Sequence, residues 1–134
     1  MHSRNAAVAY NLIVLCRHFC HQAYLDNSDM VTPVIVGRLL IYPEHHAQRL
    51  ELLILRTSRF YEVAIVGPDF NRIKTEMESN IPPNCILLGG GKHQSLKLLE
   101  NKFSPDITRI FVCENKMCKI PVTEVEQALD QLVP

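Results

Sequence analysis

The sequence has no tryptophan, no excess of charge of either sign and no hydrophobic run as long as a membrane span. Its 14 lysine and arginine residues balance its 14 aspartate and glutamate residues, so the basic surface typical of nucleic-acid-binding proteins is missing. A transmembrane helix needs about 20 apolar residues, and the first residues lack the pattern of a secretory signal peptide. We therefore expect a soluble, cytoplasmic protein that binds neither nucleic acid nor membranes.

Cysteine is sparse, and the number of cysteines is odd. Five cysteines fit the reduced thiols of an intracellular protein better than the disulfide framework of a secreted one. The chain has 134 residues, of which 47% are hydrophobic, which is the size of one domain and enough to form a buried core. It contains no internal repeat and no low-complexity tract, so we expect a folded chain.

The first 60 residues are predicted to be helical. Residues 5–22 carry an apolar stripe at helical spacing, formed by Val8, Leu12, Leu15, Cys16 and Phe19. Residues 26–33 contain Asp, Asn, Ser and Pro and predict a connection, whereas residues 34–41 are compatible with a helix or a strand. A second helix is expected to begin at Tyr42-Pro43, with an apolar stripe formed by Leu50, Leu53 and Ile54.

From residue 61 onwards, short apolar runs alternate with amphipathic segments, a pattern typical of strands joined by crossover helices. Thr123 and Glu126 have the spacing of a capping box at the start of the last helix. The predicted fold class is α/β, with a helical segment at 1–60 and a small β-α-β-α-β-β-α layer with a mostly parallel sheet at 61–134. Three strands are expected at 63–66, 85–88 and 108–113 and a fourth after residue 118, with helices at 69–79, 95–101 and 124–132.

Cys113 and Cys118 flank a four-residue polar turn between two predicted strands. If both strands form a hairpin, the two thiols lie close enough for a reversible disulfide. The spacing is not CxxC, and neither thiol lies at a predicted helix N-terminus, where a thiolate would be favoured. Two interpretations stay open: small side chains that stabilise a hairpin, or a thiol redox module that uses this pair.

Glycines follow two of the predicted strands. Ligands bind at the carboxyl ends of strands in open parallel sheets, so the residues after these strands form a candidate ligand-binding site. They are Gly67 and Asp69 after the first strand and, in a predicted turn after the second, Gly89, Gly90 and Gly91. The lysine that follows this turn precedes a histidine, not Ser or Thr, so the run does not match a phosphate-binding P-loop. A plain connection is the alternative interpretation.

Cysteines and histidines of the two predicted helices are possible ligands of a zinc ion. Cys16 and Cys20 lie four residues apart, His18 and His21 are nearby, and the pair His45-His46 stands on the second helix. Cys16 already belongs to the apolar stripe, however, and adjacent helical residues point about 100° apart. No Ser/His/Asp order and no paired catalytic carboxylates stand out, so we expect no metal, no cofactor and no catalytic residue.

Several short strings along the chain occur in an order and spacing that is specific when they are taken together. They include Asn5-Ala6-Ala7-Val8-Ala9, YEVAIVG at 61–67, Ile81-Pro82-Pro83-Asn84 and VCxxxxCxxPVTEVE at 112–126. This set resembles the C-terminal region of the thioredoxin-domain-containing proteins of the spermatogenesis-associated type. In that family a thioredoxin-like domain precedes an (α/α) barrel similar to six-hairpin glycosidases and sugar epimerases. The resemblance implies that residues 1–60 close such a barrel, and that the thioredoxin-like domain has no counterpart here.

The resemblance implies a non-catalytic structural or interaction domain, the C-terminal part of a thioredoxin-domain-containing protein. The alternatives are the thiol redox module and a remnant of a carbohydrate-active barrel, which should be inactive because one or two helix pairs cannot place two carboxylates around a sugar. The first helices would lack their usual neighbours, so we expect self-association or a partner chain over their apolar residues. These residues are Val8, Leu12, Leu15, Phe19, Leu50, Leu53 and Ile54.

Overall fold

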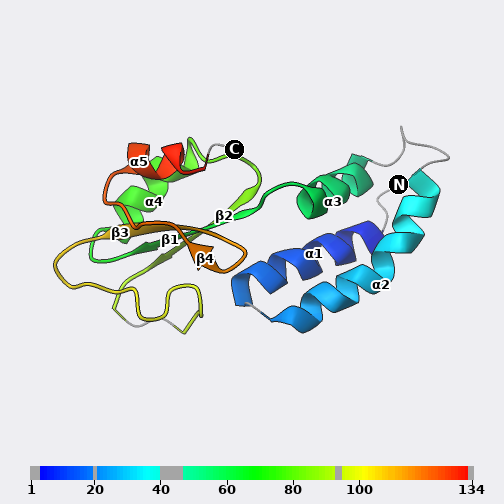
Figure 1. Cartoon of the computed structure of the whole chain (residues 1–134), viewed down its shortest axis with the longest axis horizontal. Coiled ribbons are helices and arrows are strands. Elements are labelled where there is room, and N and C mark those ends of the chain that lie inside the picture. Colours follow the sequence, from blue (N-terminus) through cyan, green and yellow to red (C-terminus); the bar gives the residue numbers. More distant parts are fainter. Residues whose placement is uncertain (1–3, 20, 40–46, 93–94, 133–134) are drawn as a thin grey trace. The chain divides into compact units, whose positions relative to one another are not determined.

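The chain divides after residue 58 into two units, residues 1–58 and residues 59–134, each with its own core. The division falls two residues before the expected boundary. The structure, a computed structural model, describes residues 4–19, 21–39, 47–92 and 95–132 (Figure 1). Among these residues no helix is long and apolar enough to cross a membrane.

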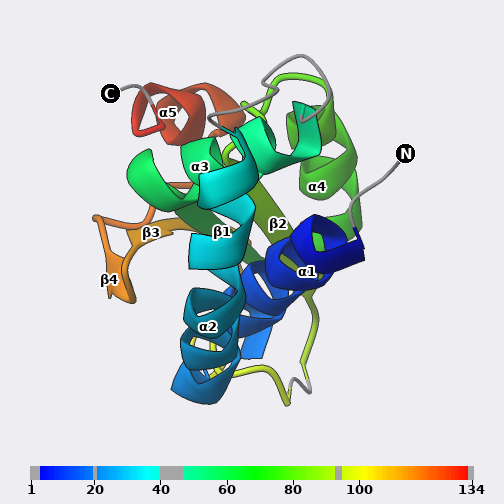
Figure 2. The same cartoon turned by 90° about the vertical axis from the view of Figure 1, so that its right-hand side faces the viewer.

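The described residues of unit 1 form three helices: α1 (Arg4–Phe19), α2 (Gln22–Leu39) and α3 (Ala47–Thr57). Helices α1 and α2 form an antiparallel hairpin and lie side by side in both views (Figures 1 and 2). The expected connection at 26–33 is wrong, because these residues form the middle of α2. Residues 34–41, which were compatible with a helix or a strand, continue α2 as far as Leu39. The expected start of the second helix at Tyr42-Pro43 lies outside the described residues.

The polar residues that predicted a connection serve instead to attach α2 to its neighbours. The fully buried Ser28 donates its hydroxyl hydrogen to the carbonyl oxygen of Ala9 in α1, at 3.2 Å. Asp29 forms an ion pair with Arg56 of α3. Pro33 has no N–H to donate within the helix, a loss that costs about 3 kcal/mol. Tertiary contacts such as these therefore outweigh local preference in α2.

The core of unit 1 is built from small side chains on α1. Ala6, Ala9 and Ile13 lie on one face of this helix and pack with Leu52 of α3, and all four are almost inaccessible to water. Alanine lets neighbouring backbones approach closely, so this face fits tightly against the other helices. The larger apolar stripe of α1 lies outside this core.

Where unit 2 is described, it is a four-stranded mixed sheet with two helices. The strands are β1 (Tyr61–Val66), β2 (Cys85–Gly90), β3 (Arg109–Glu114) and β4 (Met117–Cys118), and the helices are α4 (Phe70–Glu78) and α5 (Val125–Asp130). The strand order is β2-β1-β3-β4. Strands β1 and β2 are parallel, whereas β3 is antiparallel to both β1 and β4. The α/β class is correct, but the expectation of a mostly parallel sheet is wrong.

The connection from β2 to β3 explains the direction of β3. Val66 pairs with Gly90, the end of β2, and with Arg109, the start of β3, so both strands meet at the same end of β1. The connection from β2 to β3 therefore starts and finishes at the same end of β1. It does not have to return along the length of the sheet, so it needs no crossover helix. The expected helix at 95–101 is wrong, because this segment forms turns, with the N–H of Leu99 donating to the carbonyl oxygen of Leu96 at 2.9 Å.

Both faces of the sheet are covered, each by a different part of unit 2 (Figure 1). One face packs against α4 and α5 through Val63, Ile65, Ile73, Met77 and Ala128. The other face packs against the segment between β2 and β3 through Ala64, Val66, Leu98, Leu99 and Cys113. As a result, all six residues of β1 are buried.

Helix α5 begins one residue later than the capping box requires. Its N-cap is Glu124, whose side chain makes no capping hydrogen bond, so the predicted box of Thr123 and Glu126 is wrong. Burial of Ala128 and Leu132 against the sheet places the helix instead.

Two leucines of α3 provide a matched test of the unit 1 core. Leu52→Ala should lower the free energy of unfolding of unit 1 by about 3 kcal/mol, because Leu52 is 0% exposed and truncation leaves a cavity. Leu50→Ala should change it by less than about 0.5 kcal/mol, because Leu50 is 42% exposed. Hydrogen exchange of the amides of α1 and α2 measures both. Equal losses in the two variants would contradict the assignment of the core.

Candidate functional site

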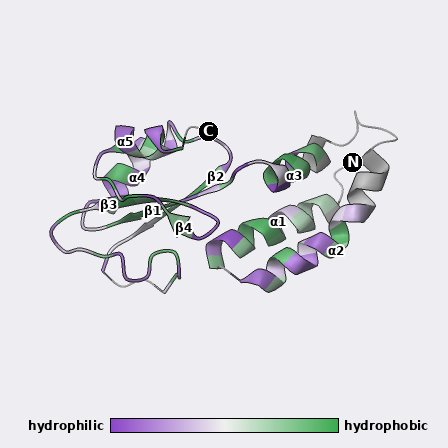
Figure 3. Ribbon diagram, in the orientation of Figure 1, coloured by the Kyte–Doolittle hydropathy of each residue, from purple (hydrophilic) through white to green (hydrophobic). Residues whose placement is uncertain are grey.

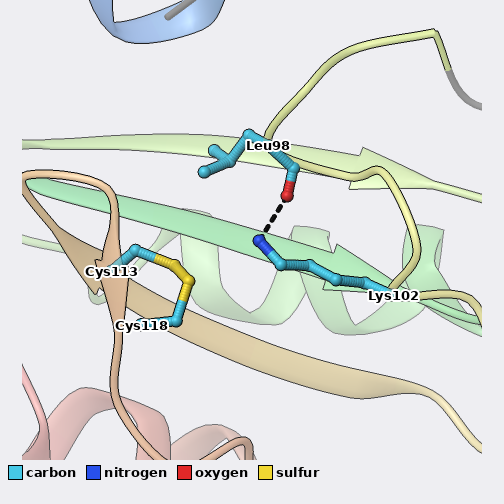
Figure 4. The surroundings of a disulfide bond; sticks show 4 residues. All are labelled: Leu98, Lys102, Cys113 and Cys118. Atoms are coloured by element: carbon cyan, nitrogen blue, oxygen red, sulfur yellow. Dashed lines mark hydrogen bonds between the residues drawn. A yellow bond between two sulfur atoms is a disulfide. The ribbon is translucent and has the colours of Figure 1, made fainter.

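Cys113 and Cys118 face each other across a tight hairpin. The connecting turn has only two residues, Asn115 and Lys116, with φ angles of 50° and 69°, the left-handed pair typical of a type I′ hairpin. This turn pairs Glu114 with Met117 and, one step further, Cys113 with Cys118. The two cysteines form a disulfide, with Cα atoms 3.8 Å apart (Figure 4).

The two halves of this disulfide lie in different environments. Cys113 is 0% exposed, in the middle of the sheet face covered by the segment between β2 and β3. Cys118 is exposed on β4, which is the edge strand of the sheet. A surface pocket of about 380 Å³ lies at the hairpin, bordered by Glu114, Asn115, Met117, Cys118 and Lys119. One sulfur-bearing residue is thus open to solvent, whereas its partner is closed off.

The segment between β2 and β3 covers the sheet face on which Cys113, the buried half of the disulfide, lies. Figure 4 draws Leu98 and Lys102 in the surroundings of the disulfide. The ammonium group of Lys102 donates to the carbonyl oxygen of Leu98 and lies 5.2 Å from the centre of the Phe111 ring. Glu62, which is 2% exposed, stands directly opposite Cys113 in the strand register. This cover separates Cys113 from solvent.

Two other cysteines are free thiols in the structure. Cys85 is half-buried at the start of β2, and desolvation by burial raises the pKa of its thiol to about 11. At neutral pH it is therefore protonated and a poor nucleophile. Cys16 is half-buried on α1. Among the described residues, the only sulfur–sulfur bond is the one between Cys113 and Cys118.

Gly67 is required by the packing of the loop between β1 and α4. Its φ angle is 148°, and a Cβ atom there would lie 2.4 Å from the Cα atom of Thr108. The hydroxyl oxygen of Thr108 also accepts a hydrogen bond from the N–H of Asp69, at 2.9 Å. Contacts with Thr108 therefore account for both residues after β1 without a ligand.

The glycine run after the second predicted strand is also explained by packing. Gly89 and Gly90 belong to β2, paired with Ile65 and Val66, so the predicted turn is wrong at these two positions. A Cβ atom on Gly89 would lie 2.8 Å from the Phe70 ring, whereas one on Gly91 would meet that ring at 3.7 Å. The structure does bring the ends of β1 and β2 together, with the N–H of Gly67 donating to the carbonyl oxygen of Gly90 at 3.2 Å.

The zinc interpretation gains no support from the part of the chain that is described. Nδ1 of His18 lies 2.9 Å from the carbonyl oxygen of Val14, so its ring bonds to its own helix. Cys20, His45 and His46 lie outside the described residues. Within the described ranges, no group of three or more His, Cys, Asp or Glu side chains is arranged to hold a metal ion.

A second candidate surface lies on unit 1. Helices α1 and α3 are rich in hydrophobic residues (Figure 3), and several of these residues are exposed outside the unit's own core. We call residues Val8, Leu12, Leu15 and Phe19 the α1 stripe; three of them are 51%, 37% and 49% exposed, in the order Val8, Leu15 and Phe19. Their spacing of four, three and four residues is that of a helix that packs on another helix. On α3, Leu50 and Ile54 are 42% and 58% exposed.

A pocket that the sequence did not indicate lies between α1 and α3. It has a volume of about 360 Å³ and is bordered by Ala6, Ala7, Tyr10, Asn11 and Glu51. These residues come from α1 and α3, and only the packing of the two helices brings them together. No motif or spacing in the sequence links Glu51 to the others.

Comparisons of this chain with family models, with curated proteins and with solved structures return no match. The resemblance to the thioredoxin-domain-containing proteins therefore stays a prediction from the sequence.

Two glycines test whether packing explains the glycine positions. Gly67→Ala should destabilise unit 2 by about 3 kcal/mol or more, because the new Cβ atom would overlap the backbone of Thr108 at a positive φ angle. Gly91→Ala should be nearly neutral, because its Cβ atom would make an ordinary contact with the Phe70 ring. Urea denaturation followed by circular dichroism measures both changes. A Gly67→Ala variant as stable as the Gly91→Ala control would contradict the packing explanation.

Proposed function

We propose that this chain is a non-catalytic interaction domain, and that it acts through the hydrophobic surface of unit 1. The observation that carries the proposal is the α1 stripe, a set of large apolar side chains that the helix turns away from its own core. Exposed apolar residues clustered at helical spacing are typical of a surface that another chain covers. The proposed partner is a helix, because the stripe has the spacing of helix-to-helix packing.

The size of the stripe indicates how strong such an interaction can be. Fully burying a leucine or phenylalanine side chain contributes about 1.5 to 3 kcal/mol, so three side chains that are about half exposed contribute roughly 3 kcal/mol. Association costs at least about 4 kcal/mol in lost freedom of motion. Two copies that bury only this stripe gain roughly 6 kcal/mol, which leaves at most about 2 kcal/mol after this cost and a Kd of tens of millimolar or weaker. A stable complex needs a partner that covers more surface, for example the outer face of α3.

Replacing stripe residues tests this surface. Leu15→Gln combined with Phe19→Gln should lower the binding of a hydrophobic dye, because both side chains are exposed. Met30→Gln combined with Ile120→Gln is the matched control, since these two residues are 78% and 81% exposed but lie off the stripe. A wild-type chain that binds no dye would sink the proposal, as would an equal loss of dye binding in the control.

The same proposal places the chain at the C-terminal end of a thioredoxin-domain-containing protein, where unit 1 would be a remnant of the (α/α) barrel. The strings shared with that family support this placement. In such a protein the rest of the barrel would supply the helix that covers the α1 stripe. The carbohydrate-active alternative receives no support from the side chains that the structure describes.

A second candidate function is a thiol redox module, and the disulfide between Cys113 and Cys118 favours it. Disulfides that are exposed have higher reduction potentials than structural ones and are the ones that exchange. Here the Cys118 half is exposed on an edge strand. We propose that this bond opens and closes in response to the thiol pool.

The reduction potential of the pair tests this second function. Equilibration in dithiothreitol buffers, followed by acid quench and alkylation, should give a midpoint between about −200 and −300 mV. A variant with Cys113→Ser and Cys118→Ser should lack the transition, because Cys16 and Cys85 are free thiols. A midpoint well below about −300 mV would make the bond a purely structural one.

A further inference from the structure

The two sulfur atoms of the disulfide offer different access to an attacking thiolate. A thiolate breaks a disulfide by attacking one of its sulfur atoms along the bond axis while the other sulfur atom leaves. Cys113 is 0% exposed and packs with Leu98 and Leu99 beneath the covered sheet face. Cys118 is exposed on the edge of the sheet. Approach to the sulfur of Cys118 is therefore open, whereas approach to that of Cys113 is blocked.

The pocket at the hairpin provides space for the molecule that carries the attacking thiol. Its volume of about 380 Å³ is bordered by Cys118 itself and by the polar residues Glu114, Asn115 and Lys119. The carboxylate of Glu114 also lies 3.9 Å from the guanidinium group of Arg59. A carboxylate and an amide bind the N–H and C=O groups of a peptide backbone. Met117, which is 76% exposed, adds an apolar contact. These borders suit a cysteine-containing peptide segment better than a bare thiol.

We propose that Cys118 is the site of thiol–disulfide exchange with peptide thiols, and that Cys113 is always the leaving sulfur. In this step the incoming thiolate forms a bond with Sγ of Cys118, and the bond between the two sulfur atoms of the protein breaks. The electron pair leaves on Sγ of Cys113, which takes up a proton. The products are a mixed disulfide at Cys118 and a thiol at Cys113. The proposal rests on the second candidate function above.

With a dithiol the same site completes a full reduction. The second thiolate of the reductant attacks its own sulfur in the mixed disulfide, so that the reductant leaves as an internal disulfide and Cys118 leaves as a thiolate. Two electrons pass from the dithiol to the protein pair. Because Cys113 remains opposite Cys118 in the hairpin register, the reverse reaction can close the bond again.

The experiment uses reduced glutathione, a peptide thiol, as the probe on the native wild-type chain. After brief exposure, the sample is quenched in acid, free thiols are alkylated and trypsin separates the two cysteines. Cleavage after Arg109, Lys116 and Lys119 yields one peptide for each, 110–116 and 117–119. Glutathione should be found on peptide 117–119 in about tenfold excess over peptide 110–116. A variant with Cys113→Ser and Cys118→Ser should take up none.

Two outcomes would overturn the proposal. The first is glutathione on both peptides in similar amounts, or mainly on the Cys113 peptide. Either result would mean that the sulfur atom of Cys113 is also open to attack. The second is uptake only after urea is added, which would mean that neither sulfur is accessible in the folded chain. Both outcomes are distinct from a failure of the redox function. A bond whose midpoint potential is too low for the cell can still be attacked at Cys118 when glutathione is in large excess.

Discussion

Complete burial of β1 is the constraint on which the rest of unit 2 depends. All six of its residues are buried, and side chains of successive residues point to opposite faces of the sheet, so both faces need a cover. Helices α4 and α5 supply one cover, and the segment between β2 and β3 supplies the other. That segment can lie flat on its face because β3 begins where β2 ends. The mixed sheet and the missing crossover helix are thus two consequences of one arrangement.

The sequence predicted elements whose signal is local, and it failed where packing between elements decides. Strand β1, helix α4 and the hairpin of Cys113 and Cys118 all follow from short patterns of apolar and turn residues. Helix α2 does not, because its Asp, Ser and Pro residues favour a loop locally and become helical only through contacts such as that of Ser28 with Ala9. The direction of β3 was equally hidden, since a run of apolar residues does not indicate which way a strand pairs.

Helix α1 shows how an apolar pattern can indicate the wrong core. The larger residues of its stripe stood out in the sequence, yet the helix packs through Ala6, Ala9 and Ile13. Alanines give a weak hydrophobic signal but allow the closest approach of backbones, and the buried Ser28 needs that closeness to reach a carbonyl oxygen of α1. Once the small face is used internally, the large face is left exposed. The candidate surface is therefore a product of which face the unit buries. The sequence predicted apolar residues without a cover, but it did not indicate the face of Ala6, Ala9 and Ile13 that packs instead.

The candidate redox site was only half visible in the sequence for a similar reason. Spacing predicted that Cys113 and Cys118 approach each other, but their unequal exposure depends on a covering segment that reaches β3 and not β4. Closing a loop with a sequence separation of only 5 residues stabilises the chain by about 2 kcal/mol. Backbone hydrogen bonds hold the residues beyond β4 independently, from Lys119 to Val112 at 2.8 Å and between Ile110 and Val122 at 2.7 and 3.0 Å. None of these hydrogen bonds depends on the disulfide itself, so we expect the two cysteines to stay opposed when the bond is reduced, as a reversible pair requires.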